Sequence, residues 1–166
     1  AEDIYEKIMQ RLSGRGIKIV VDATKNLLLN VLKYHPFLIK PNHQELGELF
    51  GVTLTEEADI IVYAGRLQKM GAVNVLISMA ENGAILLTED GTVYKKASPK
   101  GKVINSVGAG DSMVAGFLAG YLNTKDYEKA LQLGIAAGSA TAFLPWLAGK
   151  EEIVKLLQQP QEEYGL

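Results

Sequence analysis

The segment with the strongest chemical signal is Asn105-Ser-Val-Gly-Ala-Gly-Asp-Ser112. Its Gly108-Ala-Gly110 predicts a tight turn directly before a helix. The N–H groups of a helix's first turn lack intrahelical partners and lie at the positive end of the helix dipole, so they can bind an anion. Asp111 lies at the mouth of this site. Its carboxylate could accept a proton from an attacking hydroxyl, while the amides of Gly108, Ala109 and Gly110 stabilise a transferring phosphoryl group.

The same residues also allow a purely structural reading, in which Asp111 is only a helix cap after a tight turn. A face of small residues continues into the helix at Ala115, Gly116, Ala119 and Gly120, and we expect it to pack closely against a neighbour. Two other phosphate motifs do not fit. No Walker loop is present, and the third glycine of a dinucleotide fingerprint is replaced by Met113.

A second candidate segment is Lys40-Pro-Asn-His-Gln-Glu45. Asn42 and Glu45 are three residues apart, so they share one face of a helix. An amide oxygen and a carboxylate suit Mg²⁺ that is held through waters and a nucleotide's own phosphates, and Lys40 could contact a phosphate. The structural alternative is a capping box, in which Asn42 caps the helix and Glu45 bonds back to the N–H of Asn42.

A third candidate segment, Ser78-Met-Ala-Glu-Asn-Gly83, follows a buried apolar run. It reads either as a loop that lies along a nucleotide or as a plain hairpin turn. In open α/β sheets, ligands bind beyond the carboxyl ends of the strands. All three segments are expected at strand ends.

The spacing of apolar residues alternates along the chain between the period typical of helices and the pattern typical of strands. These helices and strands must position the three segments. Helices are expected at 4–12, around 27–32, after Asn42 up to Gly51, and at 60–71, 111–122, 127–144 and 151–157; strands are expected at 17–21, 37–39, 75–79, 84–88 and 92–95. Continuous apolar strands between helices predict an α/β fold with a mainly parallel sheet covered by helices on both faces. Residues 75–95 are expected to form an antiparallel excursion.

Composition restricts the class of protein. The 166 residues are 48% apolar with a net charge of −2, which excludes disorder and gives no support for a nucleic-acid partner. The absence of cysteine excludes zinc ribbons, thiol catalysis and Fe–S clusters. The apolar runs are shorter than the roughly 20 residues of a membrane span. No secretory signal is visible, which favours a cytoplasmic location.

In order and spacing, the three segments resemble the PfkB/ribokinase family of sugar kinases, along essentially the whole chain. The matching stretches are Phe37–Gly51, Val103–Ser112 and Leu133–Thr141. The resemblance implies a ribokinase-like fold and an ATP- and Mg²⁺-dependent kinase. It assigns catalysis to Asp111 with Gly108, Ala109 and Gly110; nucleotide binding to Lys40, Asn42, Ser78, Gly83, Ser106 and Gly138; and the metal to Asn42 and Glu45.

Three departures from the family pattern stand out. Ala80 replaces a usual glycine, which would restrict how closely the backbone approaches a nucleotide. Asn105 stands where ribokinase-type members often have an aspartate linked to a monovalent cation, although the phosphofructokinase branch is similar here. Family members are about twice as long. We therefore expect residues 1–166 to form a single α/β, C-terminal, nucleotide-side portion without the N-terminal half and its lid.

The branch that the chain resembles most implies phosphorylation of fructose 1-phosphate to fructose 1,6-bisphosphate, with tagatose 6-phosphate as a second possible substrate. The alternatives are a non-catalytic nucleotide-binding or structural fragment and, more distantly, a dinucleotide-dependent oxidoreductase. A missing half would leave Val20-Val21 as an open sheet edge. Because such edges invite pairing with another chain, we expect self-association and an isolated chain without activity.

Overall fold

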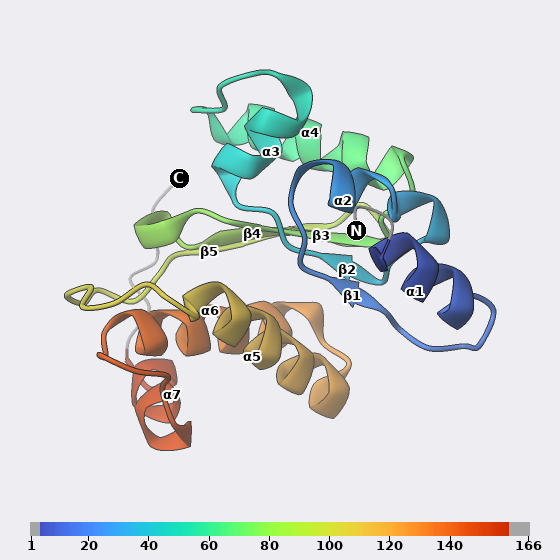
Figure 1. Cartoon of the computed structure of the whole chain (residues 1–166). Helices are drawn as coiled ribbons and strands as arrows, with labels where there is room; N and C mark the ends of the chain where they lie inside the picture. The colour runs from blue at the N-terminus through green and yellow to red at the C-terminus, as the bar shows by residue number, and fades with distance from the viewer. Residues whose placement is uncertain (1–3, 160–166) are drawn as a thin grey trace. The chain divides into compact units, whose positions relative to one another are not determined.

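A computed structural model describes residues 4–159 of the chain. Its elements are α1 (Ile4–Leu12), β1 (Val20–Val21), α2 (Lys25–Leu29), η1 (Leu32–Tyr34), β2 (Leu38–Ile39), α3 (His43–Phe50), α4 (Glu57–Lys69), β3 (Asn74–Ser78), η2 (Ala80–Asn82), β4 (Ala84–Leu87), β5 (Val93–Lys96), α5 (Ala109–Thr124), α6 (Tyr127–Ala142) and α7 (Lys150–Leu157) (Figure 1). The chain divides into two compact units, Ala1–Ser78 with Ile85–Val93 and Met79–Ala84 with Tyr94–Leu166. Within residues 4–159, no helix has both the length and the apolar character to span a bilayer.

The five strands form one sheet in the order β1-β2-β3-β4-β5. β1 pairs with β2, and β2 with β3, in parallel, with Val20 opposite Leu38 and Leu38 opposite Asn74. β3 and β4 are neighbours joined only by residues 79–83. A connection this short cannot make a parallel crossover, so β4 runs antiparallel to β3. The α/β fold with a parallel sheet and an antiparallel excursion is therefore confirmed.

The core of the first unit lies around the central strands. Leu38, Ile39 and residues 75–77 are completely buried, because apolar side chains on both faces of these strands are covered. α4 buries Ile60, Ala64 and Leu67, the stripe expected from the sequence. Figure 1 shows α3 and α4 side by side.

Both ends of α3 follow directly from the sequence. Asn42 is the N-cap residue, and Gly51 ends the helix in the left-handed conformation with φ of 67°. Glycine adopts this conformation without the steric cost of a Cβ. The helix therefore begins immediately after the turn that contains Asn42, which fixes where the candidate residues of this segment lie.

The first elements of the chain differ from the expectation. α1 spans the expected residues, but Ile4 and Ile8 are 48% and 46% exposed, and the buried residue is Met9. The strand expected at 17–21 is reduced to Val20–Val21. The helix expected around 27–32 is split into α2 and η1. Spacing identifies an apolar stripe but not the partner that must cover it, which is why the buried face of α1 was not predictable.

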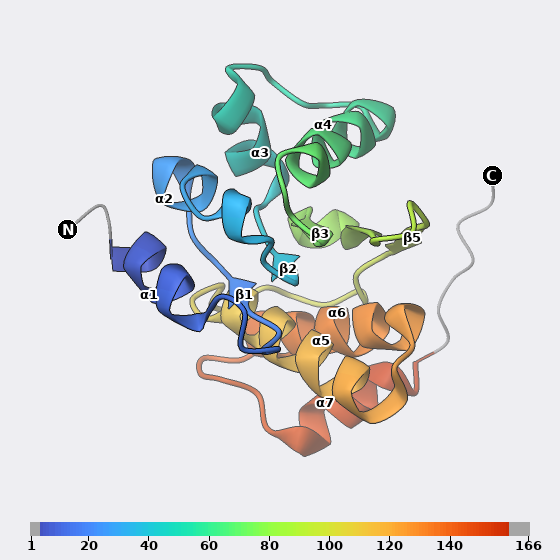
Figure 2. The same ribbon diagram turned by 90° about the vertical axis from the view of Figure 1, so that its right-hand side faces the viewer.

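The second unit is built on a helical hairpin. α5 and α6 lie side by side, with α7 beyond them in the chain (Figure 2). α5 begins at Ala109, two residues before the expected start, because Gly108 rather than Asp111 is its N-cap residue. α6 begins after Asp126, whose carboxylate accepts a hydrogen bond of 3.1 Å from the N–H of Lys129. The hairpin carries the glycine-rich candidate segment at its open end.

Candidate functional site

Polar side chains in the first unit lie where β1 and β2 end. Asp22 follows β1 and Lys40 follows β2, and the Lys40 Nζ lies 3.4 Å from the Asp22 Oδ2. Lys40 is only 8% exposed, and a buried ammonium group needs a counter-charge. Sequence reasoning missed Asp22. The available signal was its place directly after a strand, because parallel strands end at the same edge of the sheet.

Asn42 and Glu45 form the capping box at the start of α3. The Glu45 N–H donates to Asn42 Oδ1 and the Asn42 N–H donates to Glu45 Oε2, both at 2.8 Å. The structural alternative for this motif is therefore confirmed. The box leaves one carboxylate oxygen, Glu45 Oε1, for another partner.

The described residues offer little else to a metal ion. Among residues 4–159, no group of three or more His, Asp or Glu side chains could hold one. One carboxylate oxygen fits Mg²⁺ only when waters and a nucleotide's phosphates complete the coordination, which is the arrangement Mg²⁺ commonly adopts. The chemistry of Glu45 is compatible with such a site, and its role there stays a prediction.

Ser78 joins the same edge of the sheet. Asn42 and Ser78 form an isolated parallel bridge, and the Ser78 N–H donates to the carbonyl oxygen of Pro41 at 3.2 Å. The structure therefore brings Lys40, Asn42 and Ser78 together beyond the carboxyl ends of β2 and β3. This is the edge at which open α/β sheets bind ligands.

The loop after Ser78 contains a short 3₁₀ turn, η2, and joins the neighbouring strands β3 and β4, as the hairpin alternative expects. Ala80 has a φ of 50°, in the left-handed region that disfavours residues with a Cβ. This explains why a glycine suits this position. Gly83 has a φ of 90°, and a Cβ on it would lie 2.0 Å from the carbonyl oxygen of Lys96. Packing alone requires glycine at 83, so its contact with a nucleotide stays a prediction.

In the second unit, the amino end of α5 has the expected open form. Gly108 is the N-cap residue with a φ of 80°, and no side chain caps the helix. The reading of Asp111 as the cap is therefore wrong. Asp111 lies in the first turn with its side chain exposed, and no hydrogen bond or ion pair within residues 4–159 engages its carboxylate.

The backbone amides at this helix end differ in their availability. The Ala109 N–H donates to the carbonyl oxygen of Ser106 at 3.2 Å, and the helical ladder begins when the Ser112 N–H donates to Gly108 at 2.9 Å. The amide of Ala109 is therefore already hydrogen-bonded within the turn. Within residues 4–159, the amides of Gly108, Gly110 and Asp111 remain without a backbone partner, as a helix amino end predicts. An anion would bind to these three groups.

Glycines bring α6 close to α5. A Cβ on Gly116 would lie 2.7 Å from the carbonyl oxygen of Leu133, and one on Gly138 would lie 3.0 Å from that of Ala109. Gly138 is buried against the first turn of α5, and its nucleotide-binding role stays a prediction. The expected small-residue face is partly wrong: Gly116 and Gly120 are buried, but Ala115 and Ala119 are exposed. The inward face includes Met113 and Phe117 instead.

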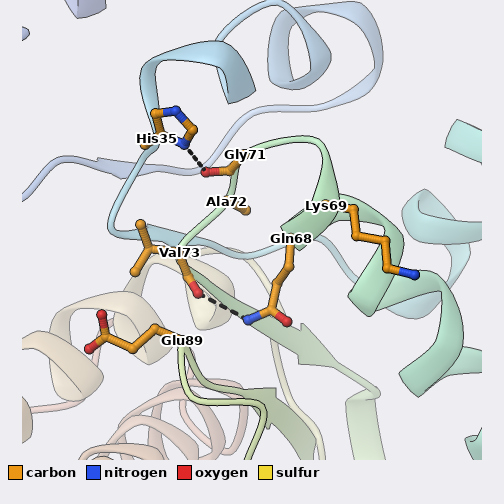
Figure 3. A pocket seen from close by; sticks show the side chains of 7 residues that line it. All are labelled: His35, Gln68, Lys69, Gly71, Ala72, Val73 and Glu89. Carbon is orange, nitrogen blue, oxygen red and sulfur yellow. Dashed lines mark hydrogen bonds between the residues drawn. The ribbon is translucent and has the colours of Figure 1, made fainter.

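A pocket of about 430 Å³ lies elsewhere in the first unit, where α4 leads into β3 (Figure 3). His35 Nδ1 is 3.0 Å from the Gly71 carbonyl oxygen, and Gln68 Nε2 donates to that of Val73 at 3.0 Å. The remaining lining residues are Lys69, Ala72 and Glu89. This pocket lies at the amino end of β3, whereas ligands of open α/β sheets bind at the carboxyl ends.

Comparison with known proteins identifies close relatives. The chain is 45% identical over 157 residues to 1-phosphofructokinase of Bacillus subtilis, which covers 95% of the chain and 52% of the relative. It is 35% identical over 161 residues to D-tagatose-1-phosphate kinase of Bacillus licheniformis, covering 96% and 53%. The chain thus spans about half the length of the curated relatives that it matches.

The fold agrees with a solved structure of similar sequence. A crystal structure described as a putative phosphofructokinase from Staphylococcus aureus superposes with a TM-score of 0.89 at 43% identity, over 95% of this chain and 51% of that one. The family model for pfkB family carbohydrate kinases matches residues 1–144, which include the strand-end residues, the glycine turn and Asp111. The chain belongs to the pfkB family of carbohydrate kinases.

Proposed function

We propose that the chain is the nucleotide-side portion of a kinase about twice as long, which transfers the γ-phosphoryl group of ATP to a phosphorylated ketohexose. The coverage of about half of each relative supports the first part of this proposal. The observation that carries the second is the uncapped amino end of α5, with the free carboxylate of Asp111 in its first turn.

Each group at this helix end has a distinct task in phosphoryl transfer. The substrate hydroxyl oxygen attacks the γ-phosphorus, the bond to the β-phosphate oxygen breaks, and ADP leaves. Asp111 accepts the hydroxyl proton as general base. The amides of Gly108 and Gly110 donate to the non-bridging oxygens, on which charge is spread in the transition state.

The residues at the sheet edge suit the other phosphates of ATP. Lys40 supplies a buried positive charge, and Ser78 supplies a hydroxyl at the end of β3. Mg²⁺ would neutralise phosphate charge when bound, and Glu45, with Asn42 beside it, would hold it through waters. These assignments agree with a class of reaction in which positioning and electrostatics supply most of the catalysis.

The proposed substrate is fructose 1-phosphate, which gives fructose 1,6-bisphosphate. The name of the Bacillus subtilis relative supports it. The name of the Bacillus licheniformis relative supports tagatose 1-phosphate as a second ketohexose phosphate to test, in addition to tagatose 6-phosphate. An enzyme that consumes ATP and a sugar phosphate would act in the cytoplasm, where both are present.

For the chain alone we propose weak MgATP binding, no sugar-phosphate turnover, and self-association. β1 is the first strand in the sheet order, and only β2 pairs with it among residues 4–159. An unpaired apolar edge recruits further strands. Sedimentation should therefore detect dimers or larger species at micromolar concentration. A monomer over the whole concentration range would contradict the edge proposal.

A coupled assay of ADP release tests the kinase against the non-catalytic alternative. The chain is assayed alone and with the remaining portion of the protein supplied in trans, with fructose 1-phosphate, tagatose 1-phosphate or tagatose 6-phosphate. We expect turnover only for the combined portions, and fastest with fructose 1-phosphate. ATP binding without turnover of any of these sugars would favour the non-catalytic alternative.

A further inference from the structure

The end of α6 makes a directional contact with the start of α5. Thr141 lies in the last turn of α6 and is 1% exposed. Its hydroxyl donates to Ser112 Oγ at 2.9 Å and accepts from the Ala148 N–H at 3.2 Å. A hydroxyl carries a single hydrogen, so Thr141 can donate one hydrogen bond. That bond goes to Ser112, the residue next to Asp111.

The same segment also holds the loop before the helix. The N–H groups of Ile104 and Asn105 both donate to the carbonyl oxygen of Ala142, at 2.8 and 3.1 Å. The Asn105 side chain accepts from the Val107 N–H at 3.0 Å and donates to the carbonyl oxygen of Pro145 at 3.2 Å. Residues 141–148 therefore contact both flanks of the glycine turn.

Within the glycine turn, a backbone hydrogen bond joins the Ala109 N–H to the carbonyl oxygen of Ser106, but no side chain caps the helix that follows. Gly108 carries no side chain to cap α5, and glycine gives the backbone more freedom than any other residue. Close packing at Gly138 limits how near α6 can come to Ala109, but such contacts are not directional. The hydroxyl contact between Thr141 and Ser112 is the directional side-chain contact between α6 and the first turn of α5, and it can fix this turn along and around its axis.

We propose that Thr141 is a positioning residue for phosphoryl transfer, acting through Ser112 to hold the amides of residues 108–111 and the Asp111 carboxylate in their catalytic orientation. The kinetic part of this inference rests on the proposed kinase function. The structural part, that the Thr141 hydroxyl orders the amino end of α5, does not.

Thr124, at the opposite end of α5, offers a matched control. Its hydroxyl donates to the carbonyl oxygen of Gly120 at 2.8 Å and accepts from the Asp126 N–H at 3.2 Å. Replacing either threonine by valine removes one donated and one accepted hydrogen bond at nearly constant volume. Thr124 differs in being exposed and in lying at the end of the helix away from Asp111.

Amide hydrogen exchange of the chain tests the structural part without any activity. Among the first-turn amides, those of Ala109 and Ser112 are hydrogen-bonded and can report protection from exchange. Thr141→Val should speed exchange at these two amides by about tenfold or more relative to residues 116–122, since the loss of one restraint opens the first turn. Thr141→Ser should restore the slow exchange, and Thr124→Val should leave Ala109 and Ser112 unchanged. Unchanged exchange at these two amides in Thr141→Val, or an equal change in Thr124→Val, would overturn the proposal.

Steady-state kinetics of the longer kinase test the catalytic part. Thr141→Val should lower kcat by about 10- to 100-fold, because small displacements of catalytic groups cost rates of this order. The KM for the sugar phosphate should stay within about threefold, with kcat recovered by Thr141→Ser and retained by Thr124→Val. A folded Thr141→Val enzyme with unchanged kcat would refute the positioning role. If the unmodified enzyme were inactive, the proposed kinase function would be refuted. The structural role of Thr141 would then be decided by the exchange experiment.

Discussion

Two helical glycines should respond differently to the same substitution. Gly65 lies within α4, and a Cβ added there would meet only Leu87 Cδ2, at 3.9 Å. Gly116 lies within α5, where a Cβ would be 2.7 Å from the carbonyl oxygen of Leu133 and 2.8 Å from the Ala137 Cβ. Neither glycine has a positive φ. The two sites therefore share their backbone conformation and differ in space.

The magnitudes follow from two opposing terms. In a helix interior, alanine is more favourable than glycine by about 1 kcal/mol. At Gly65 nothing opposes this gain, so Gly65→Ala should raise the free energy of unfolding by about 1 kcal/mol. At Gly116 the new methyl group must push a backbone carbonyl, and overpacking of this kind costs about 1–3 kcal/mol. Gly116→Ala should therefore be neutral or destabilise by up to about 2 kcal/mol.

Urea denaturation of both variants beside the unmodified chain measures the difference directly, and thermal midpoints should shift by roughly 2–4 °C for each kcal/mol. Gly65→Ala also serves as the control for any general effect of alanine. If Gly116→Ala stabilised the chain as much as Gly65→Ala, the close packing of α5 on α6 at this glycine would be refuted.

Three further predictions concern single side chains. Glu45→Gln should raise severalfold the Mg²⁺ concentration that the longer kinase needs for half-maximal activity. Its melting temperature should change little, because glutamine can still accept a hydrogen bond from the Asn42 N–H. An unchanged Mg²⁺ requirement would show that Glu45 acts only in the capping box. Ala80→Gly should stabilise the chain by less than about 1 kcal/mol in urea denaturation, since it relieves a left-handed alanine at the cost of glycine's entropy; destabilisation would contradict the strain. The hydrogen bond from the Lys129 N–H lowers the pKa of Asp126. Its stabilising effect is therefore present at neutral pH and lost as the pH falls through the carboxyl range, and melts between about pH 3 and 7 should show a weaker acid dependence for Asp126→Asn.

Local sequence signals predicted much of the fold because their causes are local. The capping residues of α3, the buried stripe of α4 and the strand-end positions of Lys40 and Ser78 follow from side-chain type, helical period and the direction of parallel strands. The glycine turn predicted a helix start, although the helix begins at Ala109 rather than at Asp111.

The remaining features depend on tertiary contacts that no local pattern encodes. The ion pair of Lys40 with Asp22 and the hydroxyl contact of Thr141 with Ser112 join residues that lie 18 and 29 positions apart. The exposure of Ile8 depends on what covers α1, and spacing alone does not contain that information. Alanine and glycine look alike in a small-residue stripe, so sequence could not separate the buried Gly116 from the exposed Ala119.

The turnover of Asp111→Asn in the longer kinase is the most direct test of the central claim, that the open end of α5 carries the catalytic base. Asparagine has the same shape but cannot accept the proton. Because the Asp111 carboxylate is exposed and engages no group within residues 4–159, the substitution should leave folding and MgATP affinity nearly unchanged. We predict a fall in kcat of about 10²- to 10⁴-fold, the usual contribution of general base catalysis. A variant that keeps most of its turnover would contradict the account.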